Sequence, residues 1–314
     1  MDTRNYPLNL AKILSDNRIS TLPSRRTTSA LGVLLDRQSY RSYEFSENRM
    51  SITLESNQEP SVQTESADLD GLRSKLIHLY DHNAPRYDND RSITESLHFY
   101  FDHAHRAVNA LIGPTSKDTL HVDMPVGTGR FLFFLREQGR DHRMIGIDIS
   151  KGMLEVAAQN SRQCGHDIEF SQGDAFSLPF ADNSVDVLTS LRMFHLFPHC
   201  YWPGLLDEMY RVLKPGGTLI TELRNAARGT ACQLLVPGFR KRRKQHPHVF
   251  VNPLSIKPLF RRWENMHMQG VGLDALSKIH RIAPILAKGV DTLQRTTFVR
   301  YFSKTLIIRA TKPF

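Results

Sequence analysis

Cysteine is scarce in this sequence: the 314 residues contain only Cys164, Cys200 and Cys232. These residues are scattered along the chain and show no C-x-x-C spacing. A disulfide framework or a cysteine-based zinc site needs paired or clustered cysteines. The sequence therefore fits a reducing compartment and predicts neither of these features.

Long apolar runs are also absent. No window approaches 18 uncharged apolar residues, so no transmembrane helix is expected. The first residues, MDTRNYPLNLAKIL, lack the apolar core and the small-residue cleavage site of a secretory signal. Acidic residues at Asp2, Asp16, Asp36 and Glu44 argue against a transit peptide, because such peptides are poor in acids. We therefore expect a cytoplasmic protein.

Two nucleotide-binding patterns are missing. The sequence has no G-x-x-x-x-G-K-[ST] segment, which argues against a P-loop. A dinucleotide fingerprint also fails, because Leu132 stands where the third glycine of G-x-G-x-x-G is required. The acids Asp182 and Asp186 belong to a predicted turn and a predicted strand, and we find no convincing metal-ligand set.

The composition is that of a globular protein with an appendage. Hydrophobic residues make up 40% of the chain and charged residues 23%, which is typical of a folded domain. Residues 1–68 differ from the rest, because they are rich in Ser, Thr, Arg and Asn and have only brief apolar patches. We interpret them as a disordered or loosely attached extension, and predict an ordered domain over residues 69–314.

The stretch from Thr119 to Asp148 organises this predicted domain. A short apolar strand leads to the turn Gly127-Thr128-Gly129, and an apolar helical segment and a second strand follow. Asp148 comes at the end of that second strand. Such a βαβ unit brings a glycine turn and a helix N-terminus beside a carboxylate roughly 20 residues on, which suits nucleoside binding.

Further strands and helices alternate along the chain. We predict strands at residues 168–171, 185–190, 218–223, 266–271 and 305–310, and helices at residues 92–112, 151–161 and 205–213. Another helical stretch is predicted from Leu273 to about Thr292. The turn Lys214-Pro215-Gly216-Gly217 joins a helix to a strand in this interpretation.

The glycine turn resembles motif I of the class I S-adenosylmethionine (SAM) methyltransferases, an acid followed by G-x-G-x-G. Asp123 supplies the acid, and Pro125 stands in place of the first glycine. The segment IDISKGMLEVAAQN resembles the D-x-S-x-x-M-L-x-x-A segment of the same superfamily, and RVLKPGG is one of its frequent signatures. Residues 76–224 match in motif order, most closely the ubiquinone/menaquinone type, the "methyltransferase type 11-like" group.

The resemblance implies a Rossmann-like, doubly wound α/β sheet of seven strands, six parallel and the seventh antiparallel. Helices would cover both faces. The segment with Tyr80-Asp81, Ala84-Pro85 and Tyr87-Asp88 would form a helical lid over the cofactor. An insertion around residues 226–300 would cover the substrate.

The same resemblance implies a set of SAM-binding residues. Asp148 would accept hydrogen bonds from both ribose hydroxyls, since a carboxylate can serve two donors. Met153 would pack against the adenine, unless it is simply a core methionine. Asp174 and the backbone of Ala175 would bind the adenine edge. The whole predicted set is Asp123, Val126, Gly127, Gly129, Asp148, Ile149, Met153, Asp174, Ala175, Ser190 and Leu191.

The predicted activity is methyl transfer from SAM to an O, N or C nucleophile of a small-molecule acceptor, anionic, lipid or quinone-like. His195, just past the fourth strand, is the candidate base, although a packed histidine explains its position equally well. Tyr87 would shape the methyl-transfer site from the lid or only seal it. Arg192 would bind an anionic group, or remain a solvated loop charge.

Two other classes of function stay open. The run Arg240–Lys244, within a chain of net charge +9, could contact nucleic acid, an anionic membrane surface or only solvent. RNA or protein methylation is therefore an alternative, although no [DN]-P-P-[YF] segment follows the fourth strand. Because Pro125 departs from motif I, a non-catalytic SAM-fold binding protein is the other alternative.

Overall fold

The computed structural model describes residues 62–92, 95–227, 249–272, 301 and 303–314, with the backbone alone described at 62–68, 90–92 and 95–99. These residues belong to one compact unit, Pro60–Phe314. The extension before residue 62, the basic run Arg240–Lys244 and the helical stretch predicted from Leu273 lie outside the described residues. Among the helices that the structure describes, none has the length and apolar character needed to cross a bilayer.

Seven strands form one sheet in the order β3-β2-β1-β4-β5-β7-β6. Strands β1 to β5 run parallel, and β7 pairs antiparallel with both β5 and β6. Six strands therefore share one direction and the seventh opposes them, which confirms the predicted fold class. The strands are β1 (Leu120–Asp123), β2 (Arg143–Asp148), β3 (Glu169–Gln172), β4 (Val185–Ser190), β5 (Leu213–Arg224), β6 (Glu264–Val271) and β7 (Thr305–Thr311).

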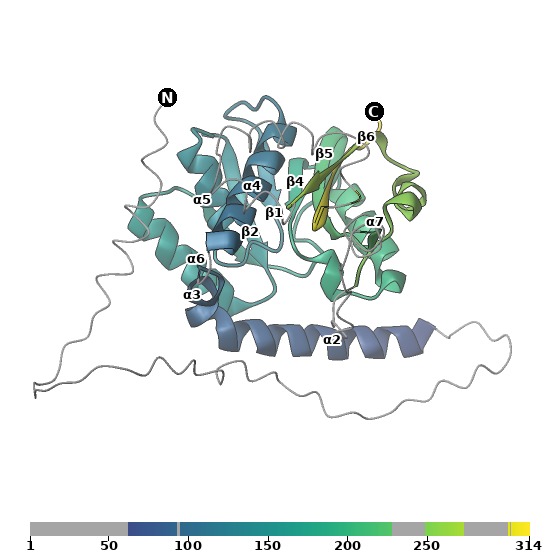
Figure 1. Cartoon of the computed structure of the whole chain (residues 1–314), viewed down its shortest axis with the longest axis horizontal. Coiled ribbons are helices and arrows are strands. Elements are labelled where there is room, and N and C mark those ends of the chain that lie inside the picture. The colour runs from purple at the N-terminus through teal and green to yellow at the C-terminus, as the bar shows by residue number, and fades with distance from the viewer. Residues whose placement is uncertain (1–61, 93–94, 228–248, 273–300, 302) are drawn as a thin grey trace, which may run out of the picture. The chain divides into compact units, whose positions relative to one another are not determined.

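The helices follow the predicted order with two differences (Figure 1). The helix expected over residues 92–112 is α4, which begins three residues later, at Glu95, while Ser92 ends α3. The fifth strand begins at Leu213, which pairs with Val185, so the expected turn lies within β5. The α-helices are α2 (Val62–Asn83), α3 (Tyr87–Ser92), α4 (Glu95–Ile112), α5 (Arg130–Glu137), α6 (Lys151–Cys164) and α7 (Trp202–Val212). The 3-10 helices are η1 (Ala84–Arg86), η2 (Phe194–Leu196), η3 (His199–Tyr201), η4 (Pro253–Ser255) and η5 (Lys257–Phe260).

Side-chain alternation along the strands divides the core into two clusters. Leu188 and Leu219 belong to one cluster with residues of α7 and η5. Their chain neighbours Val187 and Ile220 belong to the other, with residues of α4 and α5. Successive residues of a strand face opposite sides of its sheet, so the near-continuous apolar runs of these strands are explained by helices on both faces.

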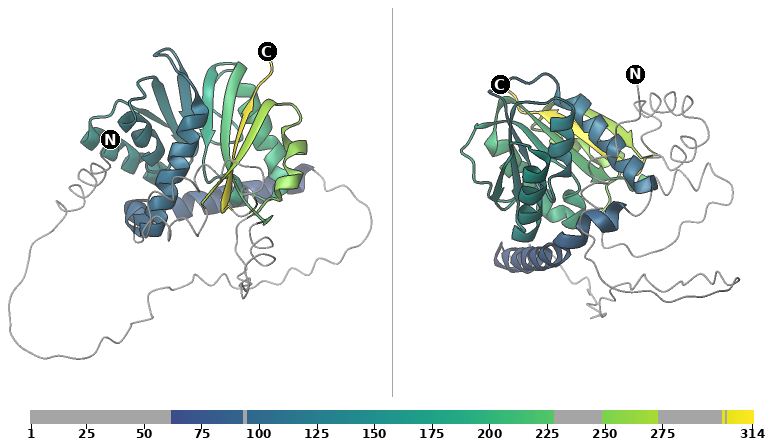
Figure 2. Two further views of the ribbon diagram at one scale, coloured as in Figure 1. Left: turned by 45° about the horizontal axis from the view of Figure 1, so that its top comes forward. Right: turned by 90° about the vertical axis from the view of Figure 1, so that its left-hand side faces the viewer.

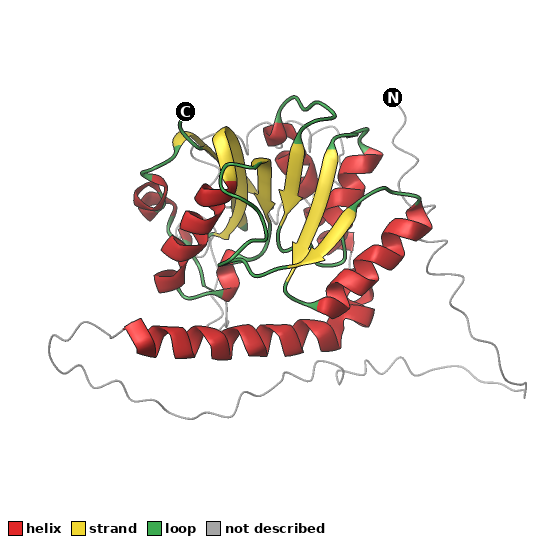
Figure 3. Ribbon diagram, turned by 180° about the vertical axis from the view of Figure 1, so that it is seen from behind, coloured by secondary structure: helices red, strands yellow, loops and turns green. Residues whose placement is uncertain are grey.

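The carboxyl ends of the parallel strands face α2. The arrowheads of these strands point toward the long helix in Figure 3, and α2 lies below the sheet in the side view of Figure 2. Strand β1 lies between β2 and β4, so the chain moves outward from β1 in both directions. In open α/β sheets, ligands bind outside the carboxyl ends of strands where the strand order reverses in this way.

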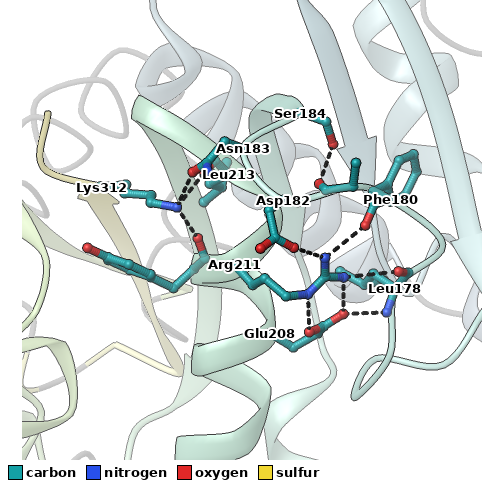
Figure 4. A network of polar contacts seen from close by, with 11 residues as sticks. Leu178, Phe180, Asp182, Asn183, Ser184, Glu208, Arg211, Leu213 and Lys312 are labelled. Atoms are coloured by element: carbon teal, nitrogen blue, oxygen red, sulfur yellow. Dashed lines mark hydrogen bonds and ion pairs between the residues drawn. The ribbon is translucent and has the colours of Figure 1, made fainter.

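A network of paired charges lies at the opposite end of the strands, beside the starts of β4 and β5 (Figure 4). Arg211 of α7 donates to Glu208, to Asp182 and to the backbone carbonyls of Phe180 and Leu178. Lys312, just after β7, donates to three oxygens in the same region. We call this set of residues the amino-end network.

Candidate functional site

The glycine turn after β1 has the sharp geometry that its sequence predicts. The peptide bond between Met124 and Pro125 is cis, and Gly127 and Gly129 have φ angles of 55° and 85°. A Cβ at Gly129 would lie 2.5 Å from Cζ of Phe133, so a side chain there would meet both backbone strain and a clash. A Cβ at Gly127 would meet no atom within 4 Å. The turn therefore has one packed glycine and one that faces open space.

Asp148 at the end of β2 is tied to this turn. Its Oδ2 accepts a hydrogen bond from the backbone N–H of Gly127 at 2.9 Å, and its Oδ1 accepts one from Ser150 at 3.0 Å. Burial raises the pKa of Asp148 to about 6, against the lowering effect of these backbone hydrogen bonds. Ile149 supplies a further backbone hydrogen bond to this carboxylate. Because each carboxylate oxygen can accept more than one hydrogen bond, Asp148 can still accept a donor from a ligand.

Asp123 at the end of β1 is held by a chain of buried hydrogen bonds. Thr189 Oγ1 donates to Asp123 Oδ1 at 2.6 Å and contacts His121 Nε2 at 2.9 Å, while His121 Nδ1 lies 3.1 Å from His142 Nε2. Because the Thr189 hydroxyl donates its only proton to Asp123, its oxygen must accept a hydrogen bond from Nε2–H of His121. Nδ1 of His121 then carries no proton and must accept from Nε2–H of His142.

Burial accounts for the protonation states along this chain. Burial lowers the pKa of His142 to about 4 and holds the pKa of His121 well below its usual range. Both rings are therefore neutral near pH 7, as the donor order requires. Burial raises the pKa of Asp123 to about 7, with the Thr189 hydrogen bond and Arg192 opposing the rise. Asp123 is thus close to its titration point at neutral pH.

Arg192 stands beyond the end of β4 in a left-handed conformation with φ of 58°, which is uncommon for a residue other than glycine. Its guanidinium carbon lies 4.8 Å from the ring centre of Phe101, and that of Arg130 lies 4.9 Å from the same ring. The Nη1 atom of Arg192 is buried and has no hydrogen-bond partner. Such an atom suits an anionic group, because its burial is otherwise uncompensated.

A second polar cluster lies near the carboxyl end of β5. Glu222 of β5 is buried, and its Oε1 accepts a hydrogen bond from the Tyr100 hydroxyl at 2.7 Å. Thr305 Oγ1 lies 3.0 Å from the same hydroxyl. Burial and the Glu222 charge raise the pKa of Tyr100 well above its usual value, so Tyr100 remains a neutral phenol.

The structure brings most of the predicted cofactor residues to one edge of the sheet. Gly127 and Asp148 are in direct contact, and the charge of Asp148 acts on Asp123. The side chain of Met153 is buried and its N–H donates to the N-cap residue Ser150, so both interpretations of Met153 stay open. Among the other predicted residues, four are also buried: Val126, Ala175, Ser190 and Leu191. Three are partly exposed: Gly127, Ile149 and Asp174.

The two predicted catalytic residues lie in short helices, His195 in η2 and Tyr87 in α3. His195 is buried, and Trp202 Nε1 fixes η2 by donating to the carbonyls of Phe194 and Phe197. Tyr87 begins α3, packs edge-on against Tyr80, and acts electrostatically on Arg192. Their catalytic roles stay predictions. In the described part of the chain, no cluster of three or more His, Cys, Asp or Glu side chains could hold a metal.

Several residues of the site were not predicted. Thr189 and His121 lie within apolar strands, where the sequence gives no sign of their polar partners. Asp81 and Asp88 were part of the quoted Tyr-Asp pairs, but only the tyrosines were assigned a role. The structure shows that both acids contact the loops of the predicted cofactor site. Their repeated place after tyrosine was the signal that could have found them.

The arrangement agrees with the comparison of this chain with known proteins. Residues 122–217, from β1 into β5, match the family model described as a methyltransferase domain. This segment is therefore similar to methyltransferase domains, and the sheet order and the glycine turn are compatible with that similarity.

Relatives with assigned names fall in the menaquinone-type group. The chain is 32% identical over 144 residues to a demethylmenaquinone methyltransferase of Thermus thermophilus, covering 45% of this chain and 62% of the relative. It is 34% identical over 137 residues to one of Deinococcus radiodurans, covering 44% and 55%. The chain therefore spans less than two thirds of the length of either relative.

Among solved structures, the fold is similar to that of the geranyl diphosphate C-methyltransferase of Streptomyces coelicolor A3(2). The TM-score is 0.49 and the identity 15%, with 69% of this chain and 80% of that chain covered. At this level of similarity no conclusion about the substrate follows.

Proposed function

We propose that this chain is a SAM-dependent methyltransferase that acts on an O, N or C nucleophile of a small molecule. The observation that carries the proposal is the contact between Asp148 and the glycine turn. This contact sets a carboxylate that can accept further hydrogen bonds beside the open side of Gly127. A ribose, with two adjacent hydroxyl donors, suits such a carboxylate.

The other residues at this edge fit the remaining parts of SAM. Asp123 can accept hydrogen bonds from an ammonium group, and Asp174, with a partly exposed side chain, can accept one from an adenine amino group. Val126, Ile149, Met153, Ala175, Ser190 and Leu191 would complete the pocket wall. SAM would supply an electrophilic methyl carbon on its sulfonium, so the protein need only align the acceptor and exclude water. Positioning of this kind is worth roughly 7–11 kcal/mol.

For the acceptor we propose a quinone-like small molecule. Support comes from the names of the two relatives, both demethylmenaquinone methyltransferases. Glu222, near the carboxyl end of β5, is compatible with such an acceptor, because its carboxylate already accepts the Tyr100 hydroxyl at Oε1 and can accept a proton from a ring hydroxyl as well. His195 and Tyr87 remain candidates for the same step. We also propose that the protein is cytoplasmic.

Calorimetry with SAM and with S-adenosylhomocysteine tests the cofactor assignment directly. We expect saturable binding at one site. Transfer of labelled methyl from SAM to quinol, RNA and protein fractions then tests the acceptor class. Label in the quinol fraction would support the proposal, whereas label confined to RNA or protein would favour the macromolecular alternative. Binding without transfer to any fraction would favour a non-catalytic protein.

A further inference from the structure

Helix α2 contacts the loop that carries Asp148. Asp81, near the end of α2, accepts hydrogen bonds from the Ser150 hydroxyl and from the Gly152 N–H, the latter at 3.0 Å. Ser150 also donates its own N–H to Asp148 at 3.0 Å. One serine thus joins the α2 carboxylate to the ribose-binding candidate.

The approach of α2 to this loop is close. A Cβ added at Gly152 would lie 3.1 Å from the Cα of Asp81 and 3.3 Å from the Cβ of Ala84. Asp81 also places a negative charge at the N-terminus of α6, where the helix dipole and free backbone N–H groups favour an anion. The position of Asp81 is therefore fixed by both packing and charge.

A second contact joins α2 to the loop after β3. Arg73 Nη2 lies 2.7 Å from Asp174 Oδ2, and the guanidinium lies 5.1 Å from the ring centre of Phe176. The other oxygen of Asp174 accepts the Phe176 N–H at 2.9 Å. Both oxygens of the adenine-binding candidate are therefore oriented, one of them by α2.

A third contact comes from α3 and reaches the glycine turn. Thr128 Oγ1 donates to Asp88 Oδ1 at 2.9 Å, and Arg130 Nη1 lies 3.8 Å from the same oxygen. Apolar side chains also dock α2, because Leu69, Leu72 and Leu76 pack against the first core cluster. Loss of one polar contact should therefore shift a loop without detaching the helix.

We propose that Arg73, Asp81 and Asp88 are positioning residues that together form a polar clamp, each holding one of the three loops that bind the cofactor. The contacts that support the clamp connect segments separated by 40 to 101 residues (from the pairs 88–128 and 73–174). The clamp rests on the proposed function, since its purpose is to fix the SAM pocket. It makes α2 and the cofactor thermodynamically coupled, so each should stabilise the other.

The test measures S-adenosylhomocysteine affinity in the full chain by calorimetry. Asp81→Ala should weaken binding by about 5- to 50-fold, within the usual range of coupling between sites. Arg73→Gln should weaken it by only about 2- to 5-fold, because its ion pair is partly exposed to solvent. Gly152→Ala should also weaken binding, since it displaces α2 without removing a polar group. The matched controls Lys75→Gln on α2 and Glu155→Gln on α6 change exposed charges and should leave affinity within twofold.

Hydrogen exchange of the α2 backbone separates positioning from mere stability. In the wild type, the ligand should slow exchange over residues 69–83, and Asp81→Ala should remove most of this added protection. Wild-type affinity in Asp81→Ala, even with a lower melting temperature, would overturn the clamp. So would a wild type whose α2 gains no protection on binding. If Asp81→Ala does not fold, Asp81→Asn, which keeps one acceptor oxygen, takes its place. Failure of the wild type to bind would instead reject the proposed function.

Discussion

The amino-end network and the candidate site, at opposite ends of the parallel strands, differ in how fully their charged groups are paired. In the amino-end network, Lys312 donates to three oxygens and Arg211 to two carboxylates and two carbonyls. At the carboxyl end, the pKa values of Asp123 and Asp148 are raised to about 7 and 6, and Arg192 has a buried nitrogen without a hydrogen bond. The charged groups of the amino-end network are thus paired within the protein, whereas the charged groups of the candidate site are incompletely compensated.

This difference separates groups that stabilise the fold from groups that are available to a ligand. A buried charge without full compensation costs stability, so its presence at a ligand-binding edge indicates a binding role. The pairs of the amino-end network leave no comparable capacity. Substitutions at the two ends should therefore change different measurements, and the following predictions test that separation.

The largest effect is expected for Asp148→Ala. Under the proposed function it removes two charge-assisted hydrogen bonds to the cofactor, so SAM affinity should fall by about tenfold to several hundredfold. Stability should change little, because the loss of the acceptor for the Gly127 and Ser150 N–H groups is offset by the removal of a buried charge. Calorimetry and thermal melting on the same variant measure both. Unchanged affinity with a lower melting temperature would reduce Asp148 to a structural residue.

The sequence predicted the positions of Asp123 and Asp148 correctly because strand ends and glycine turns are local features. It could not predict their partners. His121 and Thr189 are separated by 68 residues, and Lys312 and Asn183 by 129. Apolar periodicity reports which face of a strand is buried and contains no information about which distant polar atoms meet there.

The ends of helices and strands were only partly predictable. The apolar positions from Leu97 to Val108 correctly predicted one helix, α4, which begins at Glu95, three residues after the expected start. The start of β5 at Leu213 depends on pairing with Val185, which is a long-range contact. Lys214-Pro215-Gly216-Gly217 was therefore correctly interpreted as irregular and wrongly placed outside the strand.

At the amino end, Lys312→Met should affect stability and spare binding. The ammonium group donates to Asn183 Oδ1 at 2.6 Å and to the carbonyls of Tyr210 and Leu213 at 2.8 Å. Methionine would fill the space and leave these acceptors unpaired, at a cost of about 2–4 kcal/mol. Denaturant unfolding measures the loss, with exposed Lys117→Met as the control. A large loss of ligand affinity in the folded variant would contradict the separation of the two ends.

A smaller and pH-dependent effect is expected for Thr189→Val, which removes the hydroxyl donor to Asp123. The hydrogen bond lowers the pKa of Asp123, so the variant should hold more of this carboxyl in its protonated form at pH 7. SAM affinity should fall by about 3- to 10-fold at pH 7, and by less at pH 8.5, where Asp123 is again ionised. Thr189→Ser keeps the hydroxyl and should behave like the wild type. An affinity loss that is equal at both pH values would contradict the role of Asp123 ionisation.

The smallest effect is expected in the pH dependence of wild-type stability, because buried groups along β1 and β2 oppose one another. The pKa values of His121 and His142 are lowered on folding, so between about pH 4 and 6.5 the unfolded chain binds more protons at these rings and stability rises with pH. The pKa values of Asp123 and Asp148 are raised, so the folded chain binds more protons and stability falls as pH rises through the same range.

Burial also lowers the pKa values of His105 and His166, which adds to the rising contributions, so the falling ones are isolated by a difference measurement between about pH 4.5 and 6. The substitution Asp123→Asn removes the contribution of Asp123, which lowers the stability of the wild type as pH rises. The difference between variant and wild-type stability should therefore rise with pH by up to about 1 kcal/mol per pH unit across this window and level off above pH 7. Urea unfolding at half-unit pH steps measures this difference, and groups elsewhere cancel in the subtraction. A difference that does not change with pH would show that Asp123 has an ordinary pKa in the folded protein, and the contrast between the two ends of the sheet would then lose its electrostatic basis.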